Sequence, residues 1–321
     1  MKVSVLIPTY NSALTIGAAV DSVLSQSVPP DEILVMDDGS TDETVALLAH
    51  YGSRLTVLQQ PNQGVARARN VLCRHATGEL IAFLDHDDLW HPDYLAAQQE
   101  HFRTYPQGVA FFTGHDNFNG YGGYQWPTPP TLISSGVEVI APLDFLDRYH
   151  KAPGSFASMS YCCIPRKVLN QLGTSPFCAE VSGVDDYHLM HQLLLLGSIV
   201  LDPRPLAAYR ITPGAQSASL LKGVGKAIRA LELLEPHFDR QPDARLRKLF
   251  QAAFSAQRRE FGKILMGAAQ TGKAREQLRL SLTHCHHLKS LLKSMGLLFL
   301  TVFPDRFQPK WPADRKLSHS T

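Results

Sequence analysis

Residues 80–88, LIAFLDHDD, place an apolar segment directly before a cluster of carboxylates. The segment is predicted to be a buried strand, and Asp85, Asp87 and Asp88 follow at its end. Carboxylates this close repel one another unless water or a cation neutralises them, and hard divalent ions such as Mg²⁺ and Mn²⁺ prefer oxygen ligands of this kind. A structural interpretation stays open, in which the three aspartates are turn and cap residues and Asp88 caps a helix that begins near Pro92.

The sequence around this stretch alternates apolar strands with helical patterns. Predicted strands cover residues 3–7, 32–36, 55–58, 80–84 and 109–113, and predicted helices cover residues 17–25, 40–51, 64–75 and 92–105. Ser40 and Glu43 have the spacing of a capping box at the start of the second helix. This alternation predicts a parallel sheet with helices on both faces, in which ligands bind at the carboxyl ends of the strands.

Polar residues fall at two more of these strand ends. Thr9, Tyr10 and Asn11 follow the first strand, and Asp37 and Asp38 follow the second. The two aspartates either belong to a turn between strand and helix or accept a hydrogen bond from the N–H of a nucleobase.

Two further motifs lie at predicted helix starts. Gly64 precedes a helix with Arg67 and Arg69, which form either an anion site with the helix N-terminus or a pair of solvent-facing side chains. Asp185 and Asp186 open a helix that is predicted to run to Leu196. A carboxylate there either complements the helix dipole or acts as a general base.

The 321 residues have an ordinary globular composition. Their charges, however, divide the chain into two regions. Residues 1–219 carry 12 Lys and Arg against 21 Asp and Glu, and residues 220–321 carry 19 against 8, so the net charges are −9 and +11. This asymmetry predicts different partners for the two regions. We expect a catalytic domain at 1–219, with halves at 1–115 and 116–219, and a basic helical region at 220–321.

Within the second half, residues 117–130 are rich in Gly, Pro and aromatics and are expected to form a long loop that acts as a lid. Residues 161–212 are expected to form short strands and one helix. The longest nearly unbroken apolar run, 295–303, is far shorter than the ~20 residues of a membrane span. The sequence has no signal-peptide pattern, and its five Cys form no CxxC motif, so a reducing cytoplasm is expected. No nucleic-acid partner is expected.

Taken in order, these segments resemble glycosyltransferase family 2. The resemblance is carried by 3–11 (VSVLIPTYN), 37–42 (DDGSTD), Gly64 with 68–70 (ARN), and 84–88 (LDHDD) with Trp90 and Pro92. It is strong over residues 1–115 and continues more loosely through 185–187 (DDY) and 209–213 (YRITP), where Thr212 stands in the place of a His that many members have near the diphosphate.

The resemblance implies a GT-A fold: an α/β structure with a mixed, mostly parallel sheet flanked by helices, here with a C-terminal helical extension. It also implies a nucleotide-diphosphate sugar donor, with UDP favoured, a divalent Mn²⁺ or Mg²⁺ ion, and inversion at the anomeric carbon. By position, the implied donor-binding residues are Pro8, Thr9, Tyr10, Asn11, Asp37, Asp38, Gly64, Arg69, Asp85 and His86. Asp85 and Asp87 would hold the metal, and Asp186, with Asp185 as the alternative, would be the general base.

The expected activity is transfer of a sugar to a hydroxyl of a glycan or lipid-linked acceptor in envelope polysaccharide synthesis. A sugar nucleotidyltransferase is an alternative, although such an enzyme normally has a Gly-rich basic loop after the first strand, where this chain has residues 8–11 (PTYN). A non-catalytic protein that binds sugar nucleotides is the other alternative.

The basic C-terminal region is expected to hold the enzyme at an anionic membrane face, on the inner side of the plasma membrane. Its end combines an apolar stretch, rich in Leu from Leu288 to Phe303, with Lys289, Lys293 and Arg306. This composition suits a helix that lies in the interface. A helical lid on the catalytic domain, or a homodimer contact, is the alternative.

Overall fold

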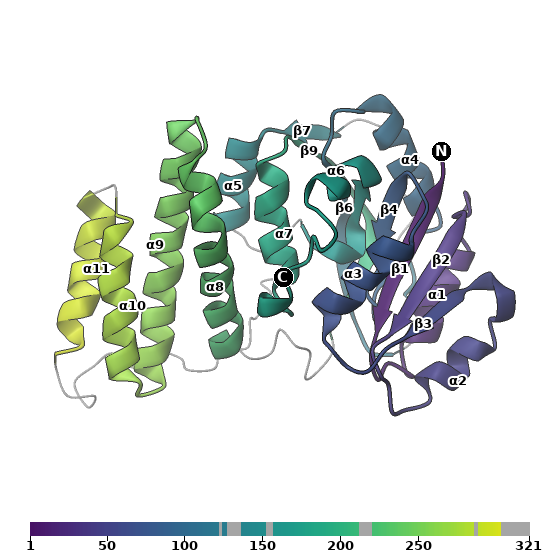
Figure 1. The fold of residues 1–321 in the computed structure, drawn as a ribbon, viewed down its shortest axis with the longest axis horizontal. Helices are drawn as coiled ribbons and strands as arrows, with labels where there is room; N and C mark the ends of the chain where they lie inside the picture. Colours follow the sequence, from purple (N-terminus) through teal and green to yellow (C-terminus); the bar gives the residue numbers. More distant parts are fainter. Residues whose placement is uncertain (122–123, 127–135, 152–156, 212–219, 286–287, 303–321) are drawn as a thin grey trace. The chain divides into compact units, whose positions relative to one another are not determined.

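The computed structural model describes residues 1–121, 124–126, 136–151, 157–211, 220–285 and 288–302. The chain forms two compact units, Met1–Thr212 and Pro213–Thr321. Figure 1 shows the first as a sheet flanked by helices and the second as helices alone.

One mixed sheet forms the centre of the first unit. Its strands are β1 (Val3–Thr9), β2 (Glu32–Asp37), β3 (Thr56–Gln59), β4 (Leu80–Phe83), β5 (Leu89–Trp90), β6 (Ala110–Asn119), β7 (Glu138–Ile140), β8 (Cys162–Pro165) and β9 (Ile199–Ile211). The order is β3-β2-β1-β4-β8-β6-β9-β5, with β7 also paired to β9. Strands β1 to β4, β6 and β9 run in one direction, and β5, β7 and β8 run in the other. The predicted mixed, mostly parallel sheet is confirmed.

The helices of this unit are α1 (Ile16–Leu24), α2 (Thr44–Ala49), α3 (Val65–His75), α4 (Tyr94–Thr104), α5 (Pro142–Lys151), α6 (Arg166–Gln171) and α7 (Asp185–Leu194). Every residue of β1 and β4 is buried, as expected for strands covered on both faces. Mostly apolar runs are what the sequence shows for β1, β2 and β4, whereas β3 (TVLQ) is partly exposed.

The second half of the unit contains more regular structure than its sequence predicts. β6 continues to Asn119 instead of ending at Thr113, because its polar end pairs with β9 from Ala110↔Ile199 to Asn119↔Ile211. β7 and α5 occupy part of the stretch 116–160, and β9 is one strand of thirteen residues where short strands were expected. Much of the predicted lid, at 122–123 and 127–130, and Thr212 lie outside the described residues.

The predicted capping box at Ser40 is wrong, and so is the alternative in which Asp88 caps a helix. α2 begins at Thr44 and not at Ser40, because the Thr44 N–H donates to Asp42 Oδ1 (3.1 Å) while Ser40 Oγ accepts from the Asn11 N–H (2.9 Å). Asp88 does not cap α4. Its Oδ1 accepts from the backbone N–H of Arg210, far away in sequence, at 2.8 Å.

The second unit consists of α8 (Leu220–Asp239), α9 (Ala244–Gly267), α10 (Thr271–Thr283) and α11 (Leu288–Leu300). Buried Leu265, Met266, Ala274 and Leu278 join α9 and α10 in one apolar cluster. Phe238 and Phe250 stack at 4.0 Å between ring centroids and join α8 to α9. Across the described helices of both units, none has the length and apolarity needed to cross a membrane.

Candidate active site

The parallel pairing of β1, β2 and β4 brings the predicted site residues to one edge of the sheet. Thr9 is in register with Asp37, and Leu6 with Phe83, so the loops after these strands start beside each other. The Asp38 N–H donates to the Thr9 carbonyl at 2.9 Å and extends the pairing by one residue. The loops 9–12, 37–40 and 84–88 therefore meet, as the sequence predicts.

Arg69 joins this edge to the start of α7. Its Nη2 donates to Asp85 Oδ1 at 2.6 Å and its Nη1 donates to Asp185 Oδ2 at 2.8 Å. The Arg69 side chain is 7% exposed and that of Asp185 is 1% exposed, whereas Asp85 is 29% exposed. The sequence predicts Arg69 as a donor ligand, but its guanidinium is engaged with two carboxylates of the protein itself.

Asp185 and Asp186 have different surroundings despite being neighbours. The Asp185 carboxylate is held by Arg69 and by the N–H of Gly183, which donates to Oδ1 at 2.8 Å. Asp186 is partly exposed, and its Oδ1 accepts from the Tyr187 N–H at 2.7 Å. Burial, followed by the negative charge of Asp185, raises the pKa of Asp186 to about 6. Of the two, Asp186 is the carboxylate that is partly exposed, and its pKa of about 6 is suited to proton exchange near neutral pH.

Arg210, from the end of β9, shapes the acidic loop. Its backbone N–H donates to Asp88 Oδ1, and its Nε donates to the carbonyl of Asp87 at 2.6 Å. Its guanidinium lies 4.4 Å above the Phe118 ring. Asp88 is buried, and burial together with the charges of Asp87 and Asp85 holds its pKa well above the usual range. Asp88 and Arg210 thus support the loop, and both lie in stretches that the sequence analysis singles out, Asp88 in 84–88 and Arg210 in 209–213.

Asp85 and Asp87 are the carboxylates of this loop that could hold a cation, because Asp88 is buried and hydrogen-bonded to Arg210. Burial and repulsion by the charge of Asp85 raise the pKa of Asp87. A divalent ion held by both carboxylates would relieve that repulsion. The described residues contain no group of three or more His, Cys, Asp or Glu that could hold a metal. Two carboxylates would therefore share the ion with water or phosphate oxygens, which is how Mg²⁺ is usually bound.

Asp38 organises the loop before α3. Its Oδ1 accepts from Gln60 Nε2 (2.6 Å) and the Gln63 N–H (2.9 Å), and its Oδ2 accepts from the Gly64 N–H (2.7 Å). Gly64 has φ +88°, and a Cβ there would lie 2.8 Å from Ser182 Oγ. Glycine is therefore required on two grounds, the left-handed backbone and the close approach of the segment before α7. Both predicted donor residues have a structural role of their own.

The residues after β1 divide into buried and exposed members. Pro8 and Thr9 are buried, and Thr9 Oγ1 is hydrogen-bonded to Ser12 Oγ. Tyr10 is 44% exposed. Asn11 has φ +47°, and its Oδ1 accepts from the Thr41 N–H at 2.8 Å. Of these four, Tyr10 and Asn11 are the exposed residues, and Tyr10 is the aromatic one.

Asp37 and His86 complete the predicted set. Asp37 is buried, and its Oδ1 accepts from the Ser40 N–H at 3.2 Å. The partly exposed His86 places Nδ1 3.4 Å from Thr15 Oγ1, at the start of α1. His86 thus lies on the α1 side of the acidic loop.

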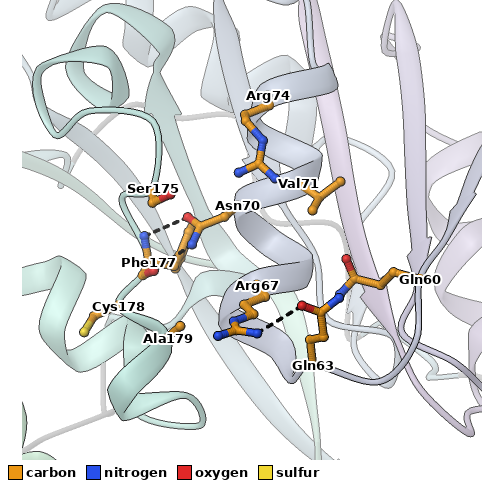
Figure 2. Close-up of a pocket in the computed structure, with 10 residues that line it drawn as sticks. All are labelled: Gln60, Gln63, Arg67, Asn70, Val71, Arg74, Ser175, Phe177, Cys178 and Ala179. Atoms are coloured by element: carbon orange, nitrogen blue, oxygen red, sulfur yellow. Dashed lines mark hydrogen bonds between the residues drawn. The ribbon is translucent and has the colours of Figure 1, made fainter.

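A separate hollow of about 450 Å³ lies along the other side of α3 (Figure 2). Arg67, Asn70 and Arg74 line it from the helix, opposite residues 175 and 177–179. Asn70 holds the two sides together, because its Nδ2 donates to the Phe177 carbonyl at 2.7 Å and its Oδ1 accepts from the Phe177 N–H at 3.0 Å. Arg67 and Arg69, paired in the sequence analysis, therefore face different surroundings.

Comparisons with known proteins agree with this architecture. The profile of glycosyl transferase family 2 matches residues 4–173. Chondroitin synthase of Escherichia coli is 35% identical over 133 residues, which are 39% of this chain and 19% of that protein. Hyaluronan synthase of Pasteurella multocida is 36% identical over 133 residues, 39% of this chain and 14% of that protein. The chain spans only about a fifth or less of the length of these two relatives.

Solved structures share the fold at low sequence identity. Staphylococcus aureus TarS 1–349 has a TM-score of 0.64 at 17% identity and covers 94% of this chain and 90% of its own. The Pyrobaculum calidifontis mannosyltransferase PcManGT has a TM-score of 0.56 at 21% identity, with coverages of 95% and 82%. The expected GT-A fold is confirmed. Since the family profile covers more than half of its length, the chain belongs to glycosyl transferase family 2.

Proposed function

We propose that the chain transfers a sugar, with inversion, from a nucleotide-diphosphate donor to a hydroxyl group, and that Asp186 is the general base. The observation that carries the proposal is the contrast at the start of α7. Arg69 and Gly183 occupy the carboxylate of Asp185, whereas Asp186 is partly exposed and has a pKa of about 6. A base with that pKa is mostly ionised at neutral pH and can still take up a proton.

The donor would lie across the ends of β1, β2 and β4. The exposed ring of Tyr10 is suited to stack on a nucleobase, and Asp85 and Asp87 would hold a divalent ion against the diphosphate. That ion, when bound, would neutralise charge on the leaving group. The related folds support this choice of donor and ion, because TarS 1–349 has been solved with UDP-GlcNAc and with UDP, and PcManGT with GDP-Man and Mn²⁺. UDP is the favoured nucleotide.

The chemistry assigned to the protein is one displacement. Asp186 accepts the proton of the acceptor hydroxyl as its oxygen bonds to the anomeric carbon, and the bond from that carbon to the diphosphate oxygen breaks. Attack from the face opposite the leaving group inverts the configuration. Arg69 acts as a positioning residue, since it fixes Asp185 and thereby the first turn of α7 that carries Asp186.

The acceptor is proposed to be a glycan or a lipid-linked sugar in envelope polysaccharide synthesis, used at the inner face of the plasma membrane. The names of the relatives, chondroitin synthase and hyaluronan synthase, support a polysaccharide product. The nucleotidyltransferase alternative is set aside by the family match.

The test is a screen of UDP- and GDP-sugars for hydrolysis and transfer with Mn²⁺, repeated with Asp186→Asn. We expect unchanged donor affinity and a turnover reduced about 10²–10⁴-fold, the usual contribution of a general base. Asp144→Asn is the matched control, because Asp144 is an exposed aspartate in the first turn of α5. An Asp186→Asn enzyme with full turnover refutes the assignment of the base, and a wild type that binds donors without turnover supports a binding protein.

A further inference from the structure

One side of α11 presents a continuous row of exposed apolar side chains. The five members are Leu288, Leu292, Met295, Phe299 and Val302, which are between 51% and 71% exposed. Their spacing of four and three residues in alternation places all five on one face of the helix and its last turn. We call this row the α11 stripe. Single exposed apolar residues are ordinary, but a contiguous row of this kind marks an interaction surface.

The orientation of the α11 stripe is set by the opposite side of the helix. Ser294 is buried there and accepts hydrogen bonds from Ser281 Oγ (2.9 Å) and Arg259 Nη1 (3.4 Å). Leu297 and Leu298 pack against the apolar cluster of α9 and α10. Turning the stripe inward would break the hydrogen bonds of Ser294 and pull Leu297 and Leu298 out of the apolar cluster.

Charge decides what kind of partner the stripe fits. α11 has Lys289 and Lys293, both exposed, and no acidic residue. Residues 220–302 contain 15 Lys and Arg against 6 Asp and Glu, a net charge of +9. An apolar face flanked by lysines, in a strongly basic unit, complements a surface that is apolar below and anionic above, which is the interface of an anionic bilayer.

A second copy of the chain fits this surface less well. If two α11 stripes packed as a coiled coil, Lys289 would take a flanking position where such pairs normally place complementary charges. The opposite flanking positions are Leu291 and Leu298, so no carboxylate of α11 could pair with it. A dimer through α11 would therefore leave the charge of Lys289 without a carboxylate partner from the other helix.

We infer that the α11 stripe docks the chain onto an anionic lipid bilayer, with α11 lying in the plane of the interface. This inference rests on the second unit alone and does not depend on the proposed donor or base. Other occupants, namely a second copy or residues 303–321 of the same chain, are separate outcomes of the test.

The experiment is flotation of the full chain with vesicles of phosphatidylcholine alone or with 30% phosphatidylglycerol. We expect binding to the anionic vesicles, loss of binding in high salt, and at least a tenfold drop in partitioning for Leu292→Ser/Phe299→Ser. Leu14→Ser is the matched control, because Leu14 is 70% exposed on the first unit. Circular dichroism should show that the double variant keeps its fold, since both side chains are exposed.

Three results would overturn the inference. The first is no flotation of the wild type. The second is flotation that the double variant retains, which would assign binding to another part of the chain, such as residues 303–321. The third is a wild-type dimer in light scattering that becomes a monomer in the double variant and never floats. Donor hydrolysis without vesicles, measured on the same variants, is expected to be unchanged. This measurement separates failure of the membrane inference from failure of the proposed function.

Discussion

Arg69 on α3 and Asp185 on α7 form a buried ion pair, with 2.8 Å between Nη1 and Oδ2, across 116 residues of sequence. The same guanidinium contacts Asp85 in the loop after β4. One arginine thus compensates carboxylates from two parts of the site, and its own pKa is raised by both of them against the effect of burial. The pair ties the helix that carries Asp186 to the edge where the parallel strands end.

Replacing Arg69 is expected to lower the stability more than replacing its exposed neighbour Arg67. Arg69→Met leaves the buried Asp185 without its cation, which for a broken buried ion pair lowers the free energy of unfolding by about 3–5 kcal/mol. Arg67→Met, on the exposed side of α3, should stay within about 0.5 kcal/mol. Urea unfolding of both variants measures the difference. Adding Asp185→Asn to Arg69→Met should recover part of the loss, and strict additivity of the two changes would contradict the coupling.

The pH dependence of turnover should report Asp186. Its pKa of about 6 means that the base is protonated below that pH, so kcat at saturating donor should fall about tenfold per pH unit below 6 and reach a plateau above 7. In Asp186→Asn, the fall of kcat below pH 6 should disappear. Because the pKa of Asp87 is raised as well, UDP affinity with Mn²⁺ must be measured over the same range. If the fall of turnover at low pH only mirrors a fall of donor affinity, the titrating group is Asp87.

The same carboxylate should reduce stability at neutral pH. Its pKa lies above the usual 3.8, so the folded chain loses stability as the pH rises through about 6, and below 3.8 the effect is absent. We expect Asp186→Asn to raise the free energy of unfolding by roughly 1–3 kcal/mol at pH 8 and to leave it unchanged at pH 3.5. Urea titrations at the two pH values measure this. A variant that is less stable at pH 8 would show that the charge is better compensated than its surroundings indicate.

Metal should strengthen nucleotide binding through Asp87. Calorimetry with UDP is expected to give a higher affinity with Mn²⁺ than with EDTA, because Asp85 and Asp87 would hold an ion that offsets the charge of the diphosphate. Asp87→Ala should remove the gain, and Asp144→Ala should keep it. Equal affinities with and without Mn²⁺ in the wild type would rule out metal-assisted donor binding.

The start of α3 should tolerate no side chain at Gly64. Gly64→Ala combines a left-handed φ with a contact of 2.8 Å to Ser182 Oγ, whereas Gly52→Ala has φ +57° and open space. We expect Gly64→Ala to cost about 2–4 kcal/mol and Gly52→Ala about 1 kcal/mol, the usual range of strain for a left-handed residue. Thermal unfolding compares them. Ser182→Ala should relieve part of the Gly64→Ala cost, and no relief would leave backbone strain as the whole cause.

The sequence predicts the first half of the fold well for a physical reason. β1, β2 and β4 are buried on both faces, so their apolar runs are visible without knowing what they pair with. β6 is different, because its last residues, Gly114 to Asn119, are mostly polar and form a strand only through pairing with β9. That partner lies just over ninety residues later, and no local pattern reveals the pairing.

The candidate site shows the same limit. The acidic loop at 85–88 and the pair Asp185 and Asp186 are predicted from residue type and position. In the structure Arg69 links them, through its ion pairs with Asp85 and Asp185. Two adjacent aspartates on one helix turn have the same local sequence context, however. The ion pair with Arg69, more than a hundred residues away, leaves Asp186 as the more available of the two, and sequence spacing does not contain that contact.

The strand order also bears on how the chain is made. The ribosome delivers β1 to β4 first, and these strands are mutual neighbours that can pair as they emerge. β6 follows but cannot join them, because its place is on the far side of β8, which is translated later. Until residues 162–165 leave the exit tunnel, the nascent chain exposes the unpaired edge of β4, and α7 and Arg210 have not yet emerged. A pause in translation at this point would display the kind of open strand edge that promotes aggregation and engages chaperones.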